Sequence, residues 1–244
     1  MKVLAVIPAR YGSSRFPGKP LVDLKGKTMI RRVYEGVKRS ESISEVIVAT
    51  DDVRICSEVE SFGGRCIMTS PDHLSGTDRC AEVATLVQDA DVVINVQGDE
   101  PLVDHRQLEQ LITAFLQPSA SIATLASRNI TAEDLDNPNR IKLVIDSKGK
   151  AMYFSRSCIP NHHHFKGNAL DHFPYLRHIG LYAYRREILL ELARLKPTLL
   201  ERTESLEQLR WMYYGYPISV VETTIETPNI DVPEDVERVL AILG

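Results

Sequence analysis

The chain has 244 residues, 43% of them hydrophobic, and a formal net charge of −4 at pH 7. This length predicts one sizeable core, so we expect a single domain over residues 1–244 with a smaller lobe at about 120–185. The weak negative charge excludes a general attraction to nucleic acid or to anionic membranes, and phosphate binding would need a local cluster of cations. The first apolar run, 3–7, is too short for a signal peptide or a membrane span, so we expect a cytoplasmic protein without membrane insertion.

The cysteines are widely spaced and form no C-x-x-C pair. They are Cys56, Cys66, Cys80 and Cys158. This pattern favours reduced, mostly buried thiols over a disulfide framework or a zinc site.

The first part of the chain alternates apolar, β-branched runs with stretches of helical spacing. The runs predict strands at 3–7, 46–50, 65–69 and 92–97. The stretches between them predict helices at about 28–39, 52–62 and 77–89. Such an alternation predicts an α/β fold with a parallel sheet covered by helices on both faces.

From about 120 to 185 the pattern changes to strands with little helix between them. These strands are expected at 121–126, 141–145, 150–156 and 177–185. They predict a mixed or antiparallel extension of the sheet. The rest of the chain is expected to form helices at about 186–194 and 204–214, a strand at 218–222 and a last helix entered at DVPED.

The loop after the first strand, PARYGSSRFPGKPL at 8–21, concentrates positive charge. It contains Arg10, Arg15 and Lys19, and the first acidic residue of the chain is Asp23. Ligands of open α/β sheets bind beyond the carboxyl ends of the strands, and cations among glycines can hold phosphate oxygens there. The spacing is not that of a Walker A loop. The competing interpretation is a solvated basic surface loop.

Two acidic segments follow later in the chain. VVINVQGDEP at 92–101 carries Asp99 and Glu100 to the same expected sheet edge as the basic loop, where carboxylates beside phosphates favour magnesium. NIDVPEDVERV at 229–239 carries Asp231 just before a predicted helix. For both segments the competing interpretation is a helix cap, since acidic residues stabilise helix N-termini. On the residues alone, capping is favoured for Asp231.

Eight segments occur together in one order: IPARYGSSRFPGKPL, VATDD, SGTDR, NVQGDEP, YFSR, RHIGLYAYR, LEQLR and IDVPED. The set resembles the CMP-Kdo synthetases, also called 3-deoxy-manno-octulosonate cytidylyltransferases, over essentially the whole chain. The loop and NVQGDEP are shared in outline with wider sugar nucleotidyltransferases, whereas CMP-sialate synthetases typically differ at 11–15. Val232 departs from the threonine expected more often in this family, but Asp231 is in place.

The resemblance implies a fold, a reaction and partners. The fold would be a Rossmann-like nucleotidyltransferase of the glycosyltransferase-A type, with a mixed, largely parallel central sheet and a smaller β-rich lobe for sugar binding and dimerisation. The reaction would join CTP and 3-deoxy-D-manno-octulosonate (Kdo) into CMP-Kdo and diphosphate for lipopolysaccharide biosynthesis. Mg²⁺ would be the cofactor and the protein a homodimer.

The resemblance also implies roles for individual residues. The nucleotide-binding set would be Arg10, Gly12, Ser13, Arg15, Lys19, Ser75, Gly76, Thr77, Arg79 and Gln97. The catalytic set would be Lys19 and Arg15, which neutralise charge as diphosphate leaves, with Asp99 and Asp231 as metal ligands. We expect these carboxylates to reach the site through the metal rather than by pairing with Lys19 or Arg15. No residue is identified as a general base.

The sugar acid would contact four residues by the same resemblance, Arg156, His178, Glu207 and Gln208. The residues alone favour other roles. Arg156 could form a surface ion pair, and His178 could be a satisfied core histidine. LEQLRWMYYG reads as an amphipathic helix that turns Leu206, Leu209 and Tyr213 inward.

The three consecutive histidines at 162–164 are expected to lie in a loop. They cannot all face one ion on a regular strand or helix, and the surrounding residues are polar. We therefore predict no metal site there, although the loop follows YFSR and could border the sugar site.

Two alternatives to Kdo activation remain from the sequence. The nucleotide motifs say little about the far end of the sugar, so the same chemistry on 8-amino-Kdo or another 2-keto sugar acid is one alternative. A nucleotide-binding regulator without turnover is the other, and the presence of Lys19, Asp99 and Asp231 argues against it.

Overall fold

The structure is a computed structural model that describes residues 1–12, 16–162, 164 and 166–243. It divides into two compact units. Unit 1 comprises Met1–Glu109, Ala183–Ala193 and Glu226–Gly244, and unit 2 comprises Gln110–Tyr182 and Arg194–Ile225. The strand β8, Leu176–Arg185, begins in unit 2 and ends in unit 1.

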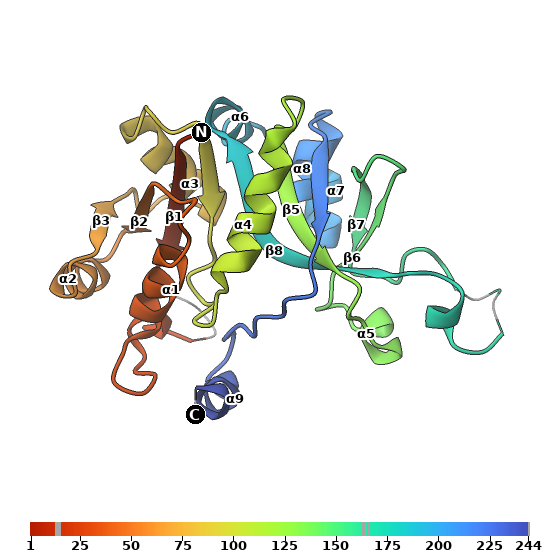
Figure 1. The fold of residues 1–244 in the computed structure, drawn as a ribbon, viewed down its shortest axis with the longest axis horizontal. Helices are drawn as coiled ribbons and strands as arrows, with labels where there is room; N and C mark the ends of the chain where they lie inside the picture. The colour runs from red at the N-terminus through yellow and green to blue at the C-terminus, as the bar shows by residue number, and fades with distance from the viewer. Residues whose placement is uncertain (13–15, 163, 165, 244) are drawn as a thin grey trace. The chain divides into compact units, whose positions relative to one another are not determined.

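Unit 1 contains a parallel sheet. Its strands are β1 (Val3–Ala9), β2 (Glu45–Thr50), β3 (Arg65–Met68) and β4 (Val92–Asn95), in the order β3-β2-β1-β4 (Figure 1). All three pairings are parallel, as the alternating pattern predicts. The central strands are mostly apolar and almost entirely buried, which is typical of a parallel sheet between helices.

Helices connect these strands and close the unit. They are α1 (Met29–Lys38), α2 (Val53–Ser61), α3 (Gly76–Leu86), α6 (Arg186–Leu192) and α9 (Asp235–Ile242), with the short turn η1 (Lys19–Leu21). The helix α4 (His105–Thr113) starts in unit 1 and ends in unit 2. Side chains of Thr28, Asp52 and Ser75 cap the first three helices, which fixes where each begins. Figure 1 shows α9 beyond the carboxyl end of β1.

Unit 2 combines parallel and antiparallel strands. β5 (Ile122–Ser127) pairs in parallel with β9 (Ile218–Glu222), whereas β6 (Lys142–Ile145) pairs antiparallel with β7 (Ala151–Ser155) and with β8. Its helices are short: α5 (Ala132–Asp136), α7 (Leu199–Glu204), α8 (Gln208–Tyr213), and the turns η2 (Ala114–Leu116) and η3 (Ala169–Asp171). The mixed pairing expected after residue 120 is therefore confirmed.

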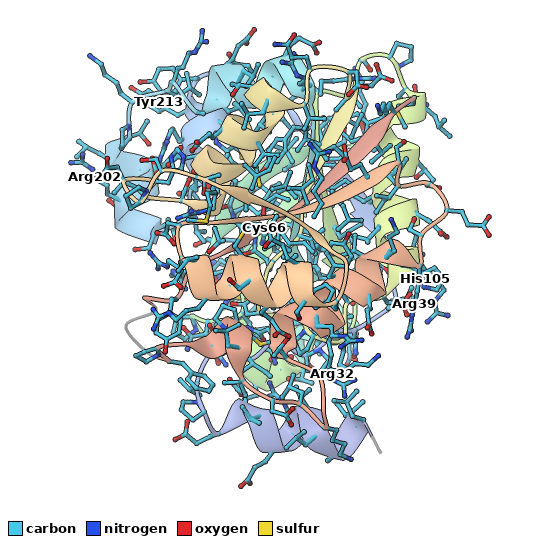
Figure 2. All side chains as sticks on the ribbon, turned by 90° about the vertical axis from the view of Figure 1, so that its left-hand side faces the viewer. Arg32, Arg39, Cys66, His105, Arg202 and Tyr213 are labelled. Carbon is cyan, nitrogen blue, oxygen red and sulfur yellow. The ribbon has the colours of Figure 1, made fainter. Side chains whose placement is uncertain are left out.

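The helix predicted at about 204–214 is present but starts later than expected. α7 ends at Glu204 and α8 starts at Gln208, because Ser205 adopts a left-handed conformation with φ 52°. Leu206 and Leu209 are buried as predicted, and Trp211 is also buried, whereas Tyr213, predicted to face inward, is 66% exposed at the end of α8. Figure 2 shows Tyr213 pointing outward from the surface.

All four cysteines are free thiols, as expected, with Cys56 and Cys80 buried and Cys66 and Cys158 half-buried. Among the described residues, no helix combines the length and the apolar character that crossing a lipid bilayer requires.

Candidate functional site

A cavity of about 250 Å³ opens at the carboxyl edge of the sheet in unit 1. Seven of the residues expected at the nucleotide or the metal line it: Arg10, Lys19, Ser75, Gly76, Arg79, Gln97 and Asp99. They come from the segments just after β1 and β4, from the turn η1 and from the start of α3. The parallel neighbouring strands β1 and β4 end at the same edge, which brings these segments to one place.

Gly98 allows the loop after β4 to lie against the end of β1. A Cβ atom on residue 98 would lie 2.7 Å from the carbonyl oxygen of Pro8, which no side chain tolerates. Glycine at this position therefore sets how closely Gln97 and Asp99 approach the basic loop.

The N-terminus of α3 forms another wall of the cavity. Ser75 Oγ accepts a hydrogen bond from the Asp78 N–H, and the Asp78 carboxylate accepts one from the Ser75 N–H. This reciprocal capping box fixes the helix start at Gly76. An eleven-residue helix presents a partial positive charge at its N-terminus, which favours an anion in the cavity.

Lys19 and Asp99 form a direct ion pair in the cavity. Lys19 Nζ lies 2.8 Å from Asp99 Oδ2, and the two side chains are 13% and 27% exposed. Our expectation that Asp99 would not pair with Lys19 is therefore wrong. The pair forms because the turn η1, at the end of the basic loop, and the loop after β4 bring a cation and a carboxylate together where solvent screens them only in part.

The Lys19 ammonium group also contacts the segment that carries Asp231. Lys19 Nζ donates to the carbonyl of Ile230 at 2.8 Å, and the Ile230 N–H donates to the carbonyl of Asp99 at 2.9 Å. The segment that carries Asp231 thus runs beside the Asp99 loop, and Asn229 Nδ2 donates to Asp231 Oδ2 at 2.8 Å.

Asp235 holds the turn that follows Asp231. Its Oδ2 accepts hydrogen bonds from the N–H groups of Asp231 at 2.8 Å and Val232 at 3.1 Å. Burial would raise the pKa of Asp235, but these N–H groups and the nearby Arg238 hold the pKa below its usual value. Asp235 therefore fixes the backbone of the turn that precedes α9. The N-cap position of α9 is Glu234, whose side chain makes no capping hydrogen bond, so the helix-cap role favoured for Asp231 is not observed.

The donor set suits magnesium. Within residues 1–12, 16–162, 164 and 166–243 there is no group of three or more histidine, cysteine or acidic side chains arranged to hold a metal ion. Asp99 lines the basic cavity, and Asp231, which does not line it, lies on the segment that is hydrogen-bonded to the Asp99 loop; both are hard carboxylate donors. Mg²⁺ is commonly held by one or two carboxylates together with substrate phosphates and water, so the pair fits this ion.

Several expected nucleotide residues are placed differently. Gly12 and Thr77 do not line the cavity, and Ser13 and Arg15 lie outside the described residues. Arg79 lines the cavity but is buried, with its guanidinium bonded to Thr69 Oγ1 and paired with Asp51 at 3.2 Å.

His73 and Leu74 line the cavity although the sequence analysis did not select them. His73 Nε2 lies 2.5 Å from Glu82 Oε2, and Leu74 is 89% exposed at the cavity's border. Their position directly before SGTDR was the available signal, because residues that lead into a helix N-terminus share its surroundings.

Within unit 2, His178 belongs to an aromatic cluster. Its Nε2 lies 3.0 Å from Thr124 Oγ1, and its ring packs against Phe154 and Tyr182. Tyr182 in turn packs edge-on against Trp211. Burial lowers the pKa of His178 to about 3, so this ring is neutral.

The side chains of Gln208 and Arg156 differ in their hydrogen-bond partners. Gln208 Nε2 is buried and has no hydrogen-bond partner among the described residues, which leaves a donor for a ligand. The Arg156 guanidinium donates to the carbonyls of Glu204 at 2.7 Å, Pro138 at 2.9 Å and Ser205 at 3.3 Å. Arg156 therefore holds the turn before α8. Its guanidinium forms no ion pair with any of the described residues, so it does not have the surface ion-pair role considered from the sequence.

Comparison with known proteins gives a consistent picture. A family described as cytidylyltransferase matches residues 4–224. The chain is 49% identical to the 3-deoxy-manno-octulosonate cytidylyltransferase of Cytophaga hutchinsonii, over 98% of this chain and 96% of that protein. It is 47% identical to the enzyme of the same name from Syntrophobacter fumaroxidans, over 100% of this chain and 98% of that protein.

A solved structure shares the fold. The CMP:2-keto-3-deoxy-manno-octonic acid synthetase complexed with CTP superposes with a TM-score of 0.93 and 44% identity, over 100% of this chain and 98% of that chain. The expected α/β nucleotidyltransferase fold, with a mixed and mostly parallel sheet, is confirmed.

Asp235→Ala should loosen the turn that carries Asp231. The variant loses two charge-assisted hydrogen bonds and should lower the free energy of unfolding by about 1–2 kcal/mol, measured by urea denaturation. Glu234→Ala, at the neighbouring exposed position, is the control and should change stability by less than about 0.5 kcal/mol. Equal losses in both variants would show that Asp235 does not hold the turn.

His178 should make stability depend on pH. Its pKa is lowered to about 3 in the folded chain but is about 6.5 when unfolded, so the unfolded state binds the proton more tightly. Stability should therefore fall as pH drops below about 6.5, by about 1 kcal/mol per pH unit, and His178→Phe should reduce that slope. Parallel stability curves for the two proteins between pH 4 and 7 would contradict the assignment.

Proposed function

The chain belongs to the 3-deoxy-manno-octulosonate cytidylyltransferase family, and we propose that it activates Kdo with CTP, using Mg²⁺, to give CMP-Kdo and diphosphate. One observation carries the proposal: a single cavity gathers Arg10, Lys19, the N-terminus of α3 and Asp99. This arrangement combines groups that bind a triphosphate with a carboxylate suited to the accompanying cation.

The residues of the cavity would act by positioning and charge neutralisation. Arg10 and Lys19 offer charge-assisted donors to phosphate oxygens, and the N-terminus of α3 adds a favourable dipole. Attack of the sugar hydroxyl on the α-phosphorus needs an in-line approach and relief of charge repulsion, and it needs no covalent protein nucleophile. Lys19 would carry part of the negative charge that builds up on the departing diphosphate.

Asp99 and Asp231 would hold the magnesium ion. When bound, the ion would lower the pKa of the attacking hydroxyl and neutralise charge on the α-phosphate. Asn229 would orient the Asp231 carboxylate through its hydrogen bond to Oδ2, and Lys19 would keep the two carboxylate-bearing segments together.

The sugar acid would be recognised in unit 2. Neutral His178 and the buried Gln208 amide offer hydrogen bonds to hydroxyl groups, and Glu207 stands beside Gln208 at the start of α8. Arg156 would act by fixing the turn that precedes these two residues, through its three carbonyl contacts. A direct contact between its guanidinium and the sugar would require part of this network to open.

We further propose a cellular setting for the activity. The family resemblance supports a cytoplasmic homodimer whose product is used in lipopolysaccharide biosynthesis.

The proposed reaction should release diphosphate from CTP only when a suitable sugar acid is present. Purified protein would be assayed with Mg²⁺, CTP and, in turn, Kdo, 8-amino-Kdo and N-acetylneuraminate. We expect the highest kcat/KM with Kdo. A preference for 8-amino-Kdo would change the assigned substrate, and CTP binding without release for every sugar would indicate a regulator.

Asp99→Asn should reduce turnover far more than CTP affinity. Loss of a carboxylate that acts on the reacting centre should lower kcat by on the order of 100-fold, whereas CTP binding measured by calorimetry should change by less than about threefold. Mn²⁺ binding, followed by electron paramagnetic resonance, should weaken in parallel. Asp104→Asn is the matched control, since Asp104 pairs with exposed Arg106 away from the cavity. An unchanged kcat in Asp99→Asn would refute the metal assignment.

A further inference from the structure

The basic loop closes on itself through Tyr11 and Gly18. The Gly18 N–H donates to the carbonyl of Tyr11 at 2.9 Å, so the residues that follow β1 lie against those that precede η1. Gly18 has φ 73°, a left-handed conformation that glycine adopts without strain. The Tyr11 ring covers it, since a Cβ atom on residue 18 would lie 3.2 Å from Cζ and Oη of Tyr11. This closure fixes where η1 begins, and Lys19 is its first residue.

The Arg54 guanidinium lies on the Tyr11 ring. Its Cζ atom is 3.3 Å from the ring centroid, which is the separation of a planar cation stacked on an aromatic face. Arg54 lies in the first turn of α2, which follows β2, whereas Tyr11 follows β1. These strands are parallel neighbours, and the register pairs Ala9 with Thr50 at their ends. The sheet therefore brings the cation and the ring together.

Asp52 holds Arg54 in this position. Arg54 Nε donates to Asp52 Oδ1 at 2.9 Å, and Nη2 donates to Oδ2 at 2.6 Å. The same carboxylate caps α2 by accepting the Arg54 N–H at 2.9 Å. Hydrogen bonds from the Arg54 side chain, together with this backbone contact, hold the pKa of Asp52 below its usual value. The guanidinium is therefore attached at two points to a capped helix start, with its face on Tyr11.

The closed loop places a cation on each side of the closure. Arg10 directly precedes Tyr11, and Lys19 directly follows Gly18. Both Arg10 and Lys19 line the cavity of unit 1, whereas Tyr11 and Arg54 are not among the described residues that line it. The contact between Tyr11 and Gly18 therefore sets the spacing of the two cations in the cavity, and Arg54 acts on that spacing from outside.

We propose that Arg54 and Tyr11 are positioning residues for triphosphate binding: the Arg54 guanidinium holds the Tyr11 ring over Gly18, and this closure keeps Arg10 and Lys19 at the spacing that phosphate oxygens require. The consequence for binding rests on the proposed function, in which these two cations contact the phosphates of CTP. The closure itself is a property of the chain without nucleotide, so the two parts are tested separately.

Amide hydrogen exchange, followed by NMR on the full chain without nucleotide, tests the closure. Arg54→Met keeps a long side chain but removes the cation, and Tyr11→Leu removes the aromatic face. Each should speed exchange of the Gly18 N–H by about three- to fivefold, the loss expected for a cation–π contact at an exposed site. Amides of β2 should exchange as in the unmodified chain, which shows that the effect is local.

Ligand-observed NMR with CTP and with CMP tests the consequence for binding. In Arg54→Met, CTP binding should weaken by about three- to fivefold, because the loop no longer presents both cations to the phosphate chain. CMP lacks the two outer phosphates, so its binding should change by less than about twofold. Arg54→Lys keeps a cation and should restore part of the CTP affinity, and Tyr11→Phe keeps the ring and should bind CTP like the unmodified chain.

Arg106→Met is the matched control. Arg106 makes the same two-point pair with Asp104, at the start of α4, and should leave both exchange at Gly18 and CTP binding unchanged. The proposal is overturned if Arg54→Met leaves the exchange rate of Gly18 unchanged, or if CTP and CMP binding weaken equally. If the unmodified chain binds no CTP, the proposed function fails and with it the role in triphosphate binding, while the exchange rates still decide whether Arg54 closes the loop.

Discussion

The ammonium group of Lys19 is the interaction on which the site in unit 1 depends. It contacts Asp99 Oδ2 and the carbonyl of Ile230, both at 2.8 Å, and so joins three segments that are distant in the chain. Because the side chain is only 13% exposed, water screens this charge less than it screens a surface lysine. Removing either Lys19 or Asp99 would leave the other charge partly buried without its counter-charge, which is destabilising. The contacts of Lys19 therefore hold the three segments together.

This arrangement gives one cation two tasks. In the structure, Lys19 neutralises a carboxylate, and in the proposed reaction it binds phosphate oxygens as well. An incoming triphosphate therefore competes with Asp99 for the same ammonium group, and the cost of that exchange is offset if Asp99 gains a metal ligand role at the same time. Arg10, which has no acidic partner among the described residues, needs no such exchange. Nucleotide and cation binding are thus expected to be coupled through a single side chain.

The sequence predicted most of the fold because periodicity is a local property. β1 and β9 begin where the apolar runs begin, and the capped helices of unit 1 begin within a residue of the predicted positions. The start of the helix predicted near 204 was misplaced because Ser205 has a left-handed conformation. Left-handed residues are usually glycine, and a serine gives no such signal. The Lys19–Asp99 pair could not be predicted either, since it joins residues 80 positions apart whose distance only the packed sheet determines. Motifs identified the residues of the site, but not their contacts with one another.

The order of the segments along the chain has a consequence for synthesis on the ribosome. Residues 226–244 return to unit 1 after all of unit 2 has been made, and the contact between Lys19 and Ile230 spans 211 positions. Most of the parallel sheet of unit 1 can form early, but the segment bearing Asp231 arrives only with the last residues. A nascent chain that ends before residue 226 would therefore contain the residues that line the cavity but lack Asp231, one of the two carboxylates proposed to hold the metal ion. On the proposed mechanism, the last residues to be synthesised therefore supply a carboxylate that turnover requires.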